Sequence, residues 1–383
     1  MPESPQRLLV ITELFMPTKG GTAVWFDEVY RRLGGKEIHV VTAAVPGAEA
    51  HDADHPNTVH RLNLKRSPWL RPESLAMYLK LLCKCVMLMA TTRFDAVHAG
   101  RVLPEGLVGW CVARLFRKPL VIYAHGEEIT TWRQSGKFRA MRFAYRHADK
   151  VIANSEFTRD ELLKLAVPEQ RIVLIYPGVD VERFRPGLPC DDLRARIGCS
   201  VADQLLLSVG RLSRRKGFDQ VVRCLPILQD KFPKLHYAVV GIGEDHDHLR
   251  ELAKELGVPE RVHLLGHVSV SELPRWYNAA DIFVMPNREI EGDVEGFGMV
   301  FIESSASGTP VVAGSSGGTS SSVCDGVSGF RIDGNSVEAI AGAIERLLGQ
   351  QSLTERIALQ GREWVVRNFS WESVVGKIAG VSK

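Results

Sequence analysis

Short apolar runs rich in β-branched residues alternate with segments of helical periodicity along the whole chain. The runs are apolar on both faces, as expected for strands of a parallel sheet that helices cover on both sides. The alternation therefore predicts an α/β domain in the first half of the chain. Its predicted strands are 7–15, 38–44, 94–100, 120–126, 150–155 and 172–178, and its predicted helices are 22–34, 74–92, 104–116, 136–147 and 157–165.

The same pattern restarts in the second half and predicts a second doubly wound domain. The join lies near 177–188, where prolines and glycines interrupt both periodicities. A last helix is expected over Trp371–Ala379, with Ser370 as its N-cap. The predicted strands of this half are 205–212, 235–243, 262–268, 281–287 and 310–316, and the predicted helices are 217–231, 245–256, 271–279, 299–307 and 336–348.

The predicted fold class is α/β, with two doubly wound, Rossmann-like parallel sheets. Two such domains are expected to face each other across a cleft between the carboxyl ends of their strands. Ligands of open α/β sheets bind at that end. The residues that directly follow the predicted strands are therefore the candidates for binding and catalysis.

The composition is that of an ordinary globular protein. The chain has 383 residues, of which 45% are apolar and 24% charged, enough for two cores and too apolar for disorder. The net charge of +3 is too small for a binder that relies on electrostatics, so no nucleic-acid partner is expected. Segment 61–150, however, carries 17 basic and 6 acidic residues. This excess favours an anionic partner, or else it forms a solvated helical surface.

Cysteine usage and the apolar segments predict a cytoplasmic location. The seven cysteines form no CxxC pair, which fits reduced thiols, and the polar N-terminus lacks the apolar region of a signal peptide. The stretch 75–90 is too short and, with Lys80 and Lys84, too charged to span a membrane. Segment 65–92 mixes Trp69 and apolar residues with several cations. It is therefore either a packed helix or a peripheral contact with an anionic membrane.

Two turns of the first domain carry candidate residues. Gly20 and Gly21 precede a helix, where paired glycines allow close backbone approach and the helix N-terminus offers N–H groups to a phosphate. The spacing is not GxGxxG, so a dinucleotide site is not supported, and the pair alone is equally compatible with a simple turn. His125 follows a predicted strand beside Glu127 and Glu128. It suits a bond to a sugar hydroxyl or a proton transfer, or it caps a loop.

The second domain opens with VGRLSRRKGF, a basic strand-to-helix turn. Arg211 and Lys216 are expected to face one diphosphate, whose departure two fixed cations can assist without a metal ion. Arg214 and Arg215 are expected to be solvated, and the whole turn could be a basic surface loop. Further turns with candidate backbone contacts follow later strands, at Gly210, Gly243, His267 and Val268.

The segment 285–318 contains two carboxylates eight positions apart, Glu295 and Glu303. Carboxylates accept hydrogen bonds from paired hydroxyl groups, such as those of a ribose and a hexose. Phe297, Gly298 and Met299 lie at the expected helix start, where N–H groups are free to bind an oxygen. Glu303 sits in the apolar run MVFIE, and a buried carboxylate needs a partner.

Taken together and in this order, these motifs resemble those of the retaining GT-B glycosyltransferases of family 4. The motifs are GG after the first strand, HGEE, GRLSRRKG, VGIGED, GHVS and EGFGMVFIE, and they span nearly the whole chain. The segment MPNREIEGDVEGFGMVFIE is similar to that of bacterial α-mannosyltransferases that modify phosphatidylinositol lipids, and to that of exopolysaccharide transferases. The resemblance implies an acceptor-binding domain over 1–180, joined by the helix 369–383, and a nucleotide-sugar-binding domain over 181–368.

The resemblance also implies a role for each candidate residue. His125, Arg211, Lys216 and Glu295 are implied at the reacting centre, and Gly20, Gly21, Gly210, Gly243, His267, Val268, Phe297, Gly298, Met299 and Glu303 around the donor. No metal or other cofactor is implied, although Asp293-Val294-Glu295 superficially resembles a DxD motif. Relatives usually have Pro-Glu shortly after the glycines of SSGG, whereas this chain continues from Gly318 with Thr-Ser-Ser-Ser.

The implied function is transfer of a hexose, with mannose favoured, from a nucleoside-diphosphate sugar to a lipid-linked or saccharide acceptor. The implied mechanism retains the anomeric configuration by front-side attack and requires no metal. A UDP-sugar-dependent glucosyl- or galactosyltransferase, a sugar-nucleotide 2-epimerase and a non-catalytic sugar-nucleotide-binding protein are the alternatives. The implied location is the cytoplasm or the inner face of the cell membrane.

Overall fold

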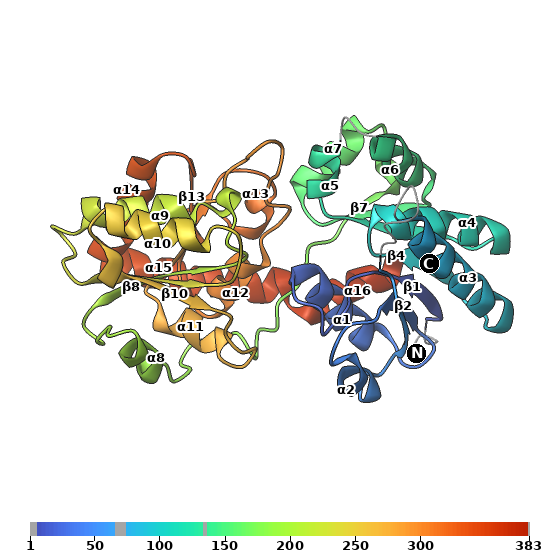
Figure 1. Ribbon diagram of the computed structural model, residues 1–383, viewed down its shortest axis with the longest axis horizontal. Coiled ribbons are helices and arrows are strands. Elements are labelled where there is room, and N and C mark those ends of the chain that lie inside the picture. Colours follow the sequence, from blue (N-terminus) through green and yellow to red (C-terminus); the bar gives the residue numbers. More distant parts are fainter. Residues whose placement is uncertain (1–5, 66–73, 133–135, 382–383) are drawn as a thin grey trace. The chain divides into compact units, whose positions relative to one another are not determined.

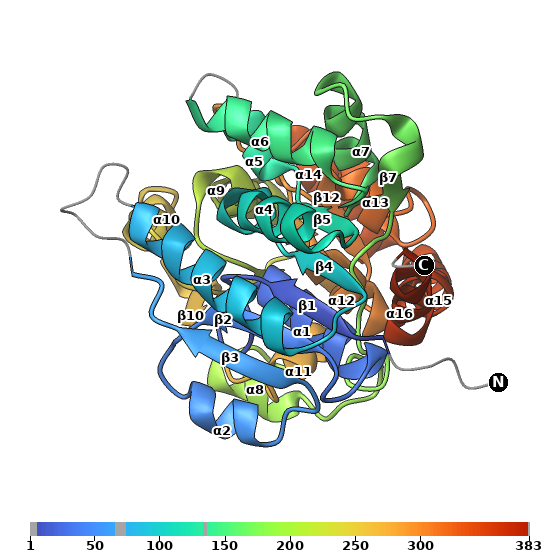
Figure 2. The same ribbon diagram turned by 90° about the vertical axis from the view of Figure 1, so that its right-hand side faces the viewer.

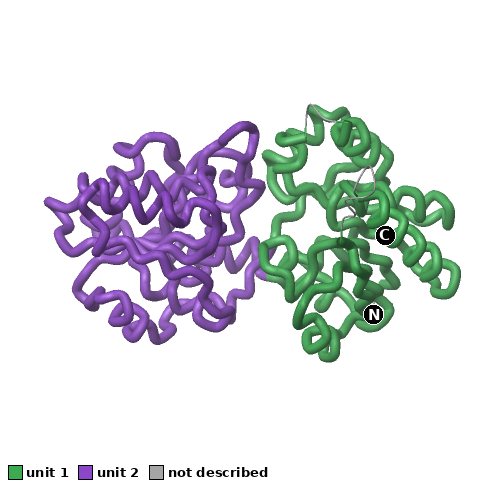
Figure 3. Tube along the Cα trace, in the orientation of Figure 1, with its two compact units in different colours: residues 1–177, 371–383 green, residues 178–370 purple. Residues whose placement is uncertain are grey.

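A computed structural model describes residues 6–65, 74–132 and 136–381. The chain forms two compact units, one comprising residues 1–177 and 371–383 and the other residues 178–370 (Figure 3). The divisions lie within three residues of the predicted boundaries. Segment 66–73, which holds Trp69 and part of the predicted membrane contact, lies outside the described residues.

Unit 1 is built on a seven-stranded sheet with the order β3-β2-β1-β4-β5-β6-β7, in which all neighbouring strands are parallel (Figure 1). Its strands are β1 (Leu8–Ile11), β2 (His39–Ala43), β3 (Thr58–Leu62), β4 (Ala96–Ala99), β5 (Leu120–Ala124), β6 (Lys150–Ala153) and β7 (Ile172–Leu174). Its helices are α1 (Gly21–Leu33), α2 (Ala48–Ala53), α3 (Leu75–Thr91), α4 (Leu107–Phe116), α5 (Glu127–Thr131), α6 (Gly136–His147), α7 (Glu156–Lys164) and α16 (Trp371–Val381).

The strand order places helices on both faces of this sheet. The chain runs outward from β1 to β3 and then returns to β4, so right-handed crossovers put α1 and α2 on one face and α3 and α4 on the other (Figure 2). The C-terminal helix α16 packs on α1, and the guanidinium of Arg32 lies 6.0 Å from the centre of the Trp371 ring. The side chain of Gln6 also donates a hydrogen bond to the carbonyl oxygen of Ala379.

Unit 2 has a six-stranded parallel sheet with the order β10-β9-β8-β11-β12-β13. Its strands are β8 (Gln204–Val209), β9 (Leu235–Val240), β10 (Val262–Gly266), β11 (Ile282–Met285), β12 (Val311–Gly314) and β13 (Gly329–Ile332). Its helices are α8 (Asp191–Arg196), α9 (Phe218–Leu228), α10 (His246–Glu255), α11 (Leu273–Ala279), α12 (Met299–Ala306), α13 (Thr319–Ser322), α14 (Val337–Gly349) and α15 (Gln351–Phe369). Short 3-10 turns at 169–171, 214–216 and 259–261 and a π-helical turn at 102–106 complete the elements.

The predicted fold class is confirmed, since both units are doubly wound parallel sheets. Each predicted strand overlaps an observed one. The two strands missed by the prediction, β3 and β13, lie at sheet edges and are mostly half-buried, so they lack the continuous apolar run of a central strand. The predicted helix 104–116 is in fact a π-helical turn followed by α4.

None of the helices among the described residues combines the length and hydrophobicity needed to cross a bilayer.

The candidate residues are distributed at the carboxyl ends of the strands. In each sheet the direction of winding reverses once, between β1 and β4 in unit 1 and between β8 and β11 in unit 2. These reversal points are where open α/β sheets bind ligands.

Candidate functional site

In unit 2 the loops after β8 and β11 meet beside the point where the winding reverses. The loop after β8 contains a 3-10 turn over Arg214–Lys216 and ends at Gly217, from which α9 begins. A Cβ atom on Gly217 would lie 2.2 Å from the carbonyl oxygen of Pro286, and Gly217 has a φ of +74°. Only glycine therefore lets the β8 loop approach the β11 loop so closely.

A buried ion cluster joins these two loops. Lys216 Nζ and Arg215 Nη1 both donate to Oε2 of Glu295, and the Arg215 bond measures 3.1 Å. The side chains of Lys216 and Glu295 are each 11% exposed, and that of Arg215 is 16% exposed. Asp293 Oδ2 lies 3.1 Å from Arg215 Nε at the open side of the cluster. The structure thus brings Lys216 and Glu295 together, as well as a second cation.

The cluster keeps Glu295 ionised. Burial alone would raise the pKa of this carboxyl, but the charges and hydrogen bonds of Lys216 and Arg215 outweigh it and lower the pKa to about 2. Two cations and one carboxylate leave the buried part of the cluster with a net charge of +1. Such a cluster can attract an anionic group such as a diphosphate.

Arg215, interpreted from the sequence as a solvated residue, is instead a half-buried member of the cluster. The sequence signal was weak, because three adjacent basic residues look like an exposed turn. Arg211 lies elsewhere and forms an ion pair with Glu244 at 3.1 Å. The Arg211 side chain is 75% exposed, and the pair joins the turns after β8 and β9. The structure therefore does not place Arg211 in the cluster with Lys216.

The SSGG turn supports the backbone of Glu295. The N–H of Gly318 donates to the carbonyl oxygen of Glu295 at 2.7 Å, and a Cβ atom on Gly317 would lie 2.3 Å from the same oxygen. Thr319–Ser322, which directly follow these glycines, form α13, and Ser322 Oγ donates to the carbonyl oxygen of Phe297 at 2.5 Å. Gly318 and Ser322 therefore fix the backbone of segment 295–297.

Glu303 is the second carboxylate of the segment and lies on α12. Its Oε2 accepts a hydrogen bond of 2.8 Å from the hydroxyl of Tyr277, which α11 supplies. Burial raises the pKa of Glu303 above its ordinary value. Gly298, in the left-handed region with a φ of +84°, is the N-cap of α12, and Met299 is its first residue. The side chain of Phe297 is buried.

The other predicted residues of unit 2 lie at the same end of the sheet, where the carboxyl ends of the strands are found. The turns at Gly210 and Gly243 are packed tightly, since a Cβ atom on Gly243 would lie 2.3 Å from the carbonyl oxygen of Leu212. His267 is exposed and Val268 is buried in the turn that follows β10.

In unit 1 the predicted residues follow β1 and β5. Gly20 is the N-cap of α1 with a φ of +124°, and Gly21 is the first helical residue. His125 is almost fully buried, and its Nε2 lies 2.8 Å from the carbonyl oxygen of Gly100. Because a carbonyl only accepts, Nε2 carries the proton and Nδ1 is left as an acceptor. Burial lowers the pKa of His125, so the ring is neutral near pH 7.

Glu128 and Gly100 hold His125 in place; Glu128 was named from the sequence only as a neighbour of His125, and Gly100 was not singled out. Glu128 Oε1 accepts from the backbone N–H of His125 at 3.0 Å and from the hydroxyl of Tyr145 at 2.5 Å. The edge of the His125 ring also meets Trp25, with the ring centres 5.7 Å apart. The ring is thus fixed between the turns that follow β4 and β5.

The described residues contain two groups of His, Cys, Asp and Glu with the spacing of metal ligands. They are Asp27 with His51 and His55, and Cys199 with Asp203 and His236. Neither group includes a residue predicted to contact the donor.

Comparisons with known proteins place both units in one family. Residues 191–364 match the family described as "Glycosyl transferases group 1", and residues 19–183 match that described as "Glycosyltransferase Family 4". A GDP-mannose-dependent alpha-(1-6)-phosphatidylinositol monomannoside mannosyltransferase of Mycolicibacterium smegmatis is 31% identical, over 97% of each chain. A D-inositol 3-phosphate glycosyltransferase of Thermobifida fusca is 32% identical, over 93% of this chain and 86% of its own.

Solved structures share the two-domain GT-B fold. The Anabaena protein HepE, crystallised with UDP and glucose, matches with a TM-score of 0.81 and 23% identity over 98% of each chain. The sucrose-phosphate synthase of Thermosynechococcus elongatus matches with a TM-score of 0.77 and 22% identity, also over 98% of each chain.

The buried cluster generates a prediction about stability. Replacing Glu295 with Gln leaves Lys216 without its carboxylate partner and Arg215 with Asp293 alone, and loss of one partner of a buried ion pair typically costs about 3 kcal/mol. We expect the free energy of unfolding of unit 2, measured by urea denaturation at pH 7, to fall by about that amount. The matched control is Glu244→Gln, which removes an exposed ion pair and should cost less than about 1 kcal/mol.

The wild type and Glu295→Gln should also differ in how their free energies of unfolding change with pH. The folded-state pKa of Glu295 is about 2 and its ordinary value is 4.5, so its stabilising effect is complete above pH 4.5. This contribution is lost as the pH falls from about 4.5 towards 2, in the wild type but not in Glu295→Gln. Equal costs for the two substitutions, or parallel acid profiles, would show that the cluster does not stabilise the fold.

Proposed function

This chain belongs to the glycosyltransferases of family 4 and group 1, and from this premise we propose that it transfers mannose from GDP-mannose to a hydroxyl group of a lipid-linked acceptor. The observation that carries the proposal is the 31% identity over 97% of the chain to an enzyme named for GDP-mannose and a phosphatidylinositol mannoside. A UDP-hexose donor with a saccharide acceptor is the second candidate, since the same cations suit any nucleoside diphosphate.

The donor is assigned to unit 2. Lys216 and Arg215 stand beside the reversal point of the sheet, where an open α/β fold receives ligands. Arg211 is exposed at the adjacent turn, and its long side chain can turn towards a bound diphosphate. In this proposal Lys216 and Arg211 hold the diphosphate, Glu295 holds sugar hydroxyls and Glu303 holds the ribose diol.

The reaction needs no covalent intermediate. The acceptor hydroxyl attacks the anomeric carbon on the face from which the diphosphate leaves, and a diphosphate oxygen takes the proton of that hydroxyl. The fixed cations stabilise the charge that develops on the leaving group, so no metal is required for this step. His125 stays neutral and presents Nδ1 as an acceptor for a sugar hydroxyl.

The acceptor is assigned to unit 1, together with a peripheral contact to the inner face of the cell membrane. On α3 the exposed apolar side chains Leu75, Leu79 and Met87 are spaced by four and eight residues, so they form one stripe. Lys80 and Lys84 lie on the same helix. An apolar stripe flanked by cations suits an anionic bilayer surface.

The transfer proposal predicts a product that only a glycosyltransferase makes. With GDP-mannose and phosphatidylinositol monomannoside, and without added divalent metal, we expect a mannosylated lipid whose new linkage is α by NMR. Replacing Lys216 with Met should lower kcat by about 100- to 1,000-fold, because a fixed charge on the leaving group is lost. The control Lys234→Met removes a lysine that is 72% exposed and should leave kcat unchanged.

Three outcomes would contradict the proposal. An epimerised nucleotide sugar from donor alone would indicate the epimerase. A β linkage would exclude front-side retention. Equal rates for the two lysine variants would show that Lys216 does not stabilise the leaving diphosphate.

The membrane contact predicts lipid-dependent sedimentation. Wild-type protein should sediment with vesicles containing phosphatidylinositol and not with pure phosphatidylcholine vesicles. Leu79 is 52% exposed, and its replacement by Glu should reduce the bound fraction at least about threefold. The control Leu359→Glu changes a leucine on α15 of unit 2 that is 63% exposed, and it should leave sedimentation unchanged. Equal binding by both variants would show that α3 makes no membrane contact.

A further inference from the structure

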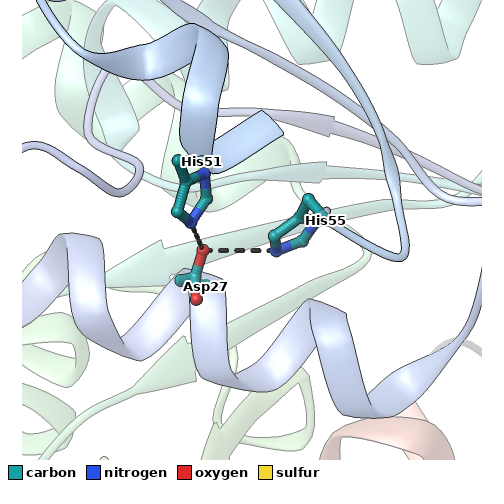
Figure 4. A group of neighbouring side chains, drawn as sticks. All are labelled: Asp27, His51 and His55. Atoms are coloured by element: carbon teal, nitrogen blue, oxygen red, sulfur yellow. Dashed lines mark ion pairs between the residues drawn. The ribbon is translucent and has the colours of Figure 1, made fainter. Parts of the chain in front are cut away.

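Unit 1 contains a cluster of three metal-ligating side chains away from all residues assigned to the donor. Asp27 lies on the second turn of α1, His51 lies on α2, and His55 lies just beyond α2, four residues after His51. Figure 4 shows both imidazole rings directed at the same carboxylate oxygen of Asp27. Asp27 is 3% exposed and His55 is 1% exposed, so the cluster is buried.

The distances suit a small tetrahedral ion. Asp27 Oδ1 lies 2.8 Å from His51 Nε2 and 3.2 Å from His55 Nε2, and the three ligand atoms lie within 4.8 Å of one another. Zinc bonds of about 2.0–2.1 Å place the ligand atoms of a tetrahedral site about 3.3 Å apart. The two separations from Asp27 Oδ1 differ from that value by about 0.5 and 0.1 Å.

Two atoms of the cluster lack hydrogen bonds. Among the described residues, neither Asp27 Oδ1 nor His55 Nε2 has a partner with hydrogen-bond geometry, although the two atoms face each other. Buried polar atoms without a partner are uncommon in folded proteins, and a bound ion is one of the features that satisfies them. Arg31 approaches the other oxygen, Oδ2, at 3.5 Å and leaves Oδ1 to the imidazoles.

An outer set of contacts holds His51 in the orientation of a metal ligand. His51 Nδ1 lies 3.2 Å from Asp52 Oδ1, and Asp52 is fixed by Arg61 through bonds of 2.8 and 2.9 Å. A carboxylate on the second nitrogen is the usual support of a zinc-bound histidine. Phe15 packs edge-on against both imidazoles, with ring centres 6.0 and 5.3 Å away.

We propose that Asp27, His51 and His55 form a zinc site that braces the loop between β1 and α1. Two imidazoles and one carboxylate are a typical zinc ligand set, and water completes the tetrahedron. The loop is tied to the site twice, since Phe15 packs on the imidazoles and Arg61 also donates to the carbonyl oxygen of Met16. The same loop continues into Gly20, the N-cap of α1. The inference does not depend on the proposed transferase function.

The alternative is a purely hydrogen-bonded cluster. The backbone N–H of Asn57 lies 3.2 Å from His55 Nδ1, which places the proton of that ring on Nε2. A metal ion can bind Nε2 only if the ring proton lies on Nδ1. Because Nδ1 would then be a donor, it could no longer accept from the Asn57 N–H, and the ring would rotate slightly away from that group. The two states are therefore mutually exclusive and can be told apart by metal binding.

The test is metal binding by the full-length chain after treatment with a chelator. We expect one equivalent of Zn²⁺ by elemental analysis, a tetrahedral absorption spectrum with Co²⁺, and a higher Tm with Zn²⁺. Asp27→Asn and His55→Gln should each weaken Zn²⁺ binding more than about 100-fold, since loss of an outer-shell partner alone costs about 10- to 100-fold. His60→Gln is the matched control, because His60 pairs only with His39 at 3.1 Å among the contacts described and should not affect binding.

No tetrahedral Co²⁺ spectrum and no Tm shift in the wild type would establish the hydrogen-bonded cluster and overturn the proposal. Binding by Asp27→Asn and His55→Gln equal to that of the wild type would place the ion elsewhere and overturn it as well. Circular dichroism checks that these variants fold. If both fail to fold, His51→Gln, whose side chain is 18% exposed, takes their place and is expected to lose Zn²⁺ binding.

Discussion

The pairing of Glu295 with Lys216 and Arg215 is the interaction on which the architecture of unit 2 depends. A carboxylate with so little exposure is costly to bury unless cations and hydrogen bonds compensate it. The cations lie 79 and 80 residues before Glu295 in the sequence. They meet it because β8 and β11 are neighbours in the sheet, so the strand order itself creates the cluster.

Close backbone contacts make this geometry possible. The β8 loop touches the β11 loop at Gly217, and the SSGG turn touches the backbone of Glu295 at Gly317. A side chain at either position would push the loops apart and separate the charges. Gly217 and Gly317 thus have a structural role in the cluster. In the proposed function the cations serve a second purpose, since two cations against one carboxylate in the buried part of the cluster suit a departing diphosphate.

The sequence predicted the fold well because central strands are apolar on both faces. It missed β3 and β13, whose half-exposed edge positions remove that signal, and it missed the long helix α15. Lys216 and Glu295 were foreseen as site residues, and the structure places them in contact. Arg215 was not foreseen, because the direction of a side chain in a short 3-10 turn depends on the neighbouring loop. The Asp27 cluster gave no usable signal, since its aspartate is separated from the histidines by a strand.

We propose that the cluster around Glu295 receives a nucleoside diphosphate. The decisive experiment is calorimetric titration of the pure chain with GDP, UDP and ADP in the absence of divalent metal. We expect saturable binding at one site, strongest for GDP, that Lys216→Met weakens and Lys234→Met does not. Absence of binding by all three diphosphates, or equal affinity in the two lysine variants, would contradict it.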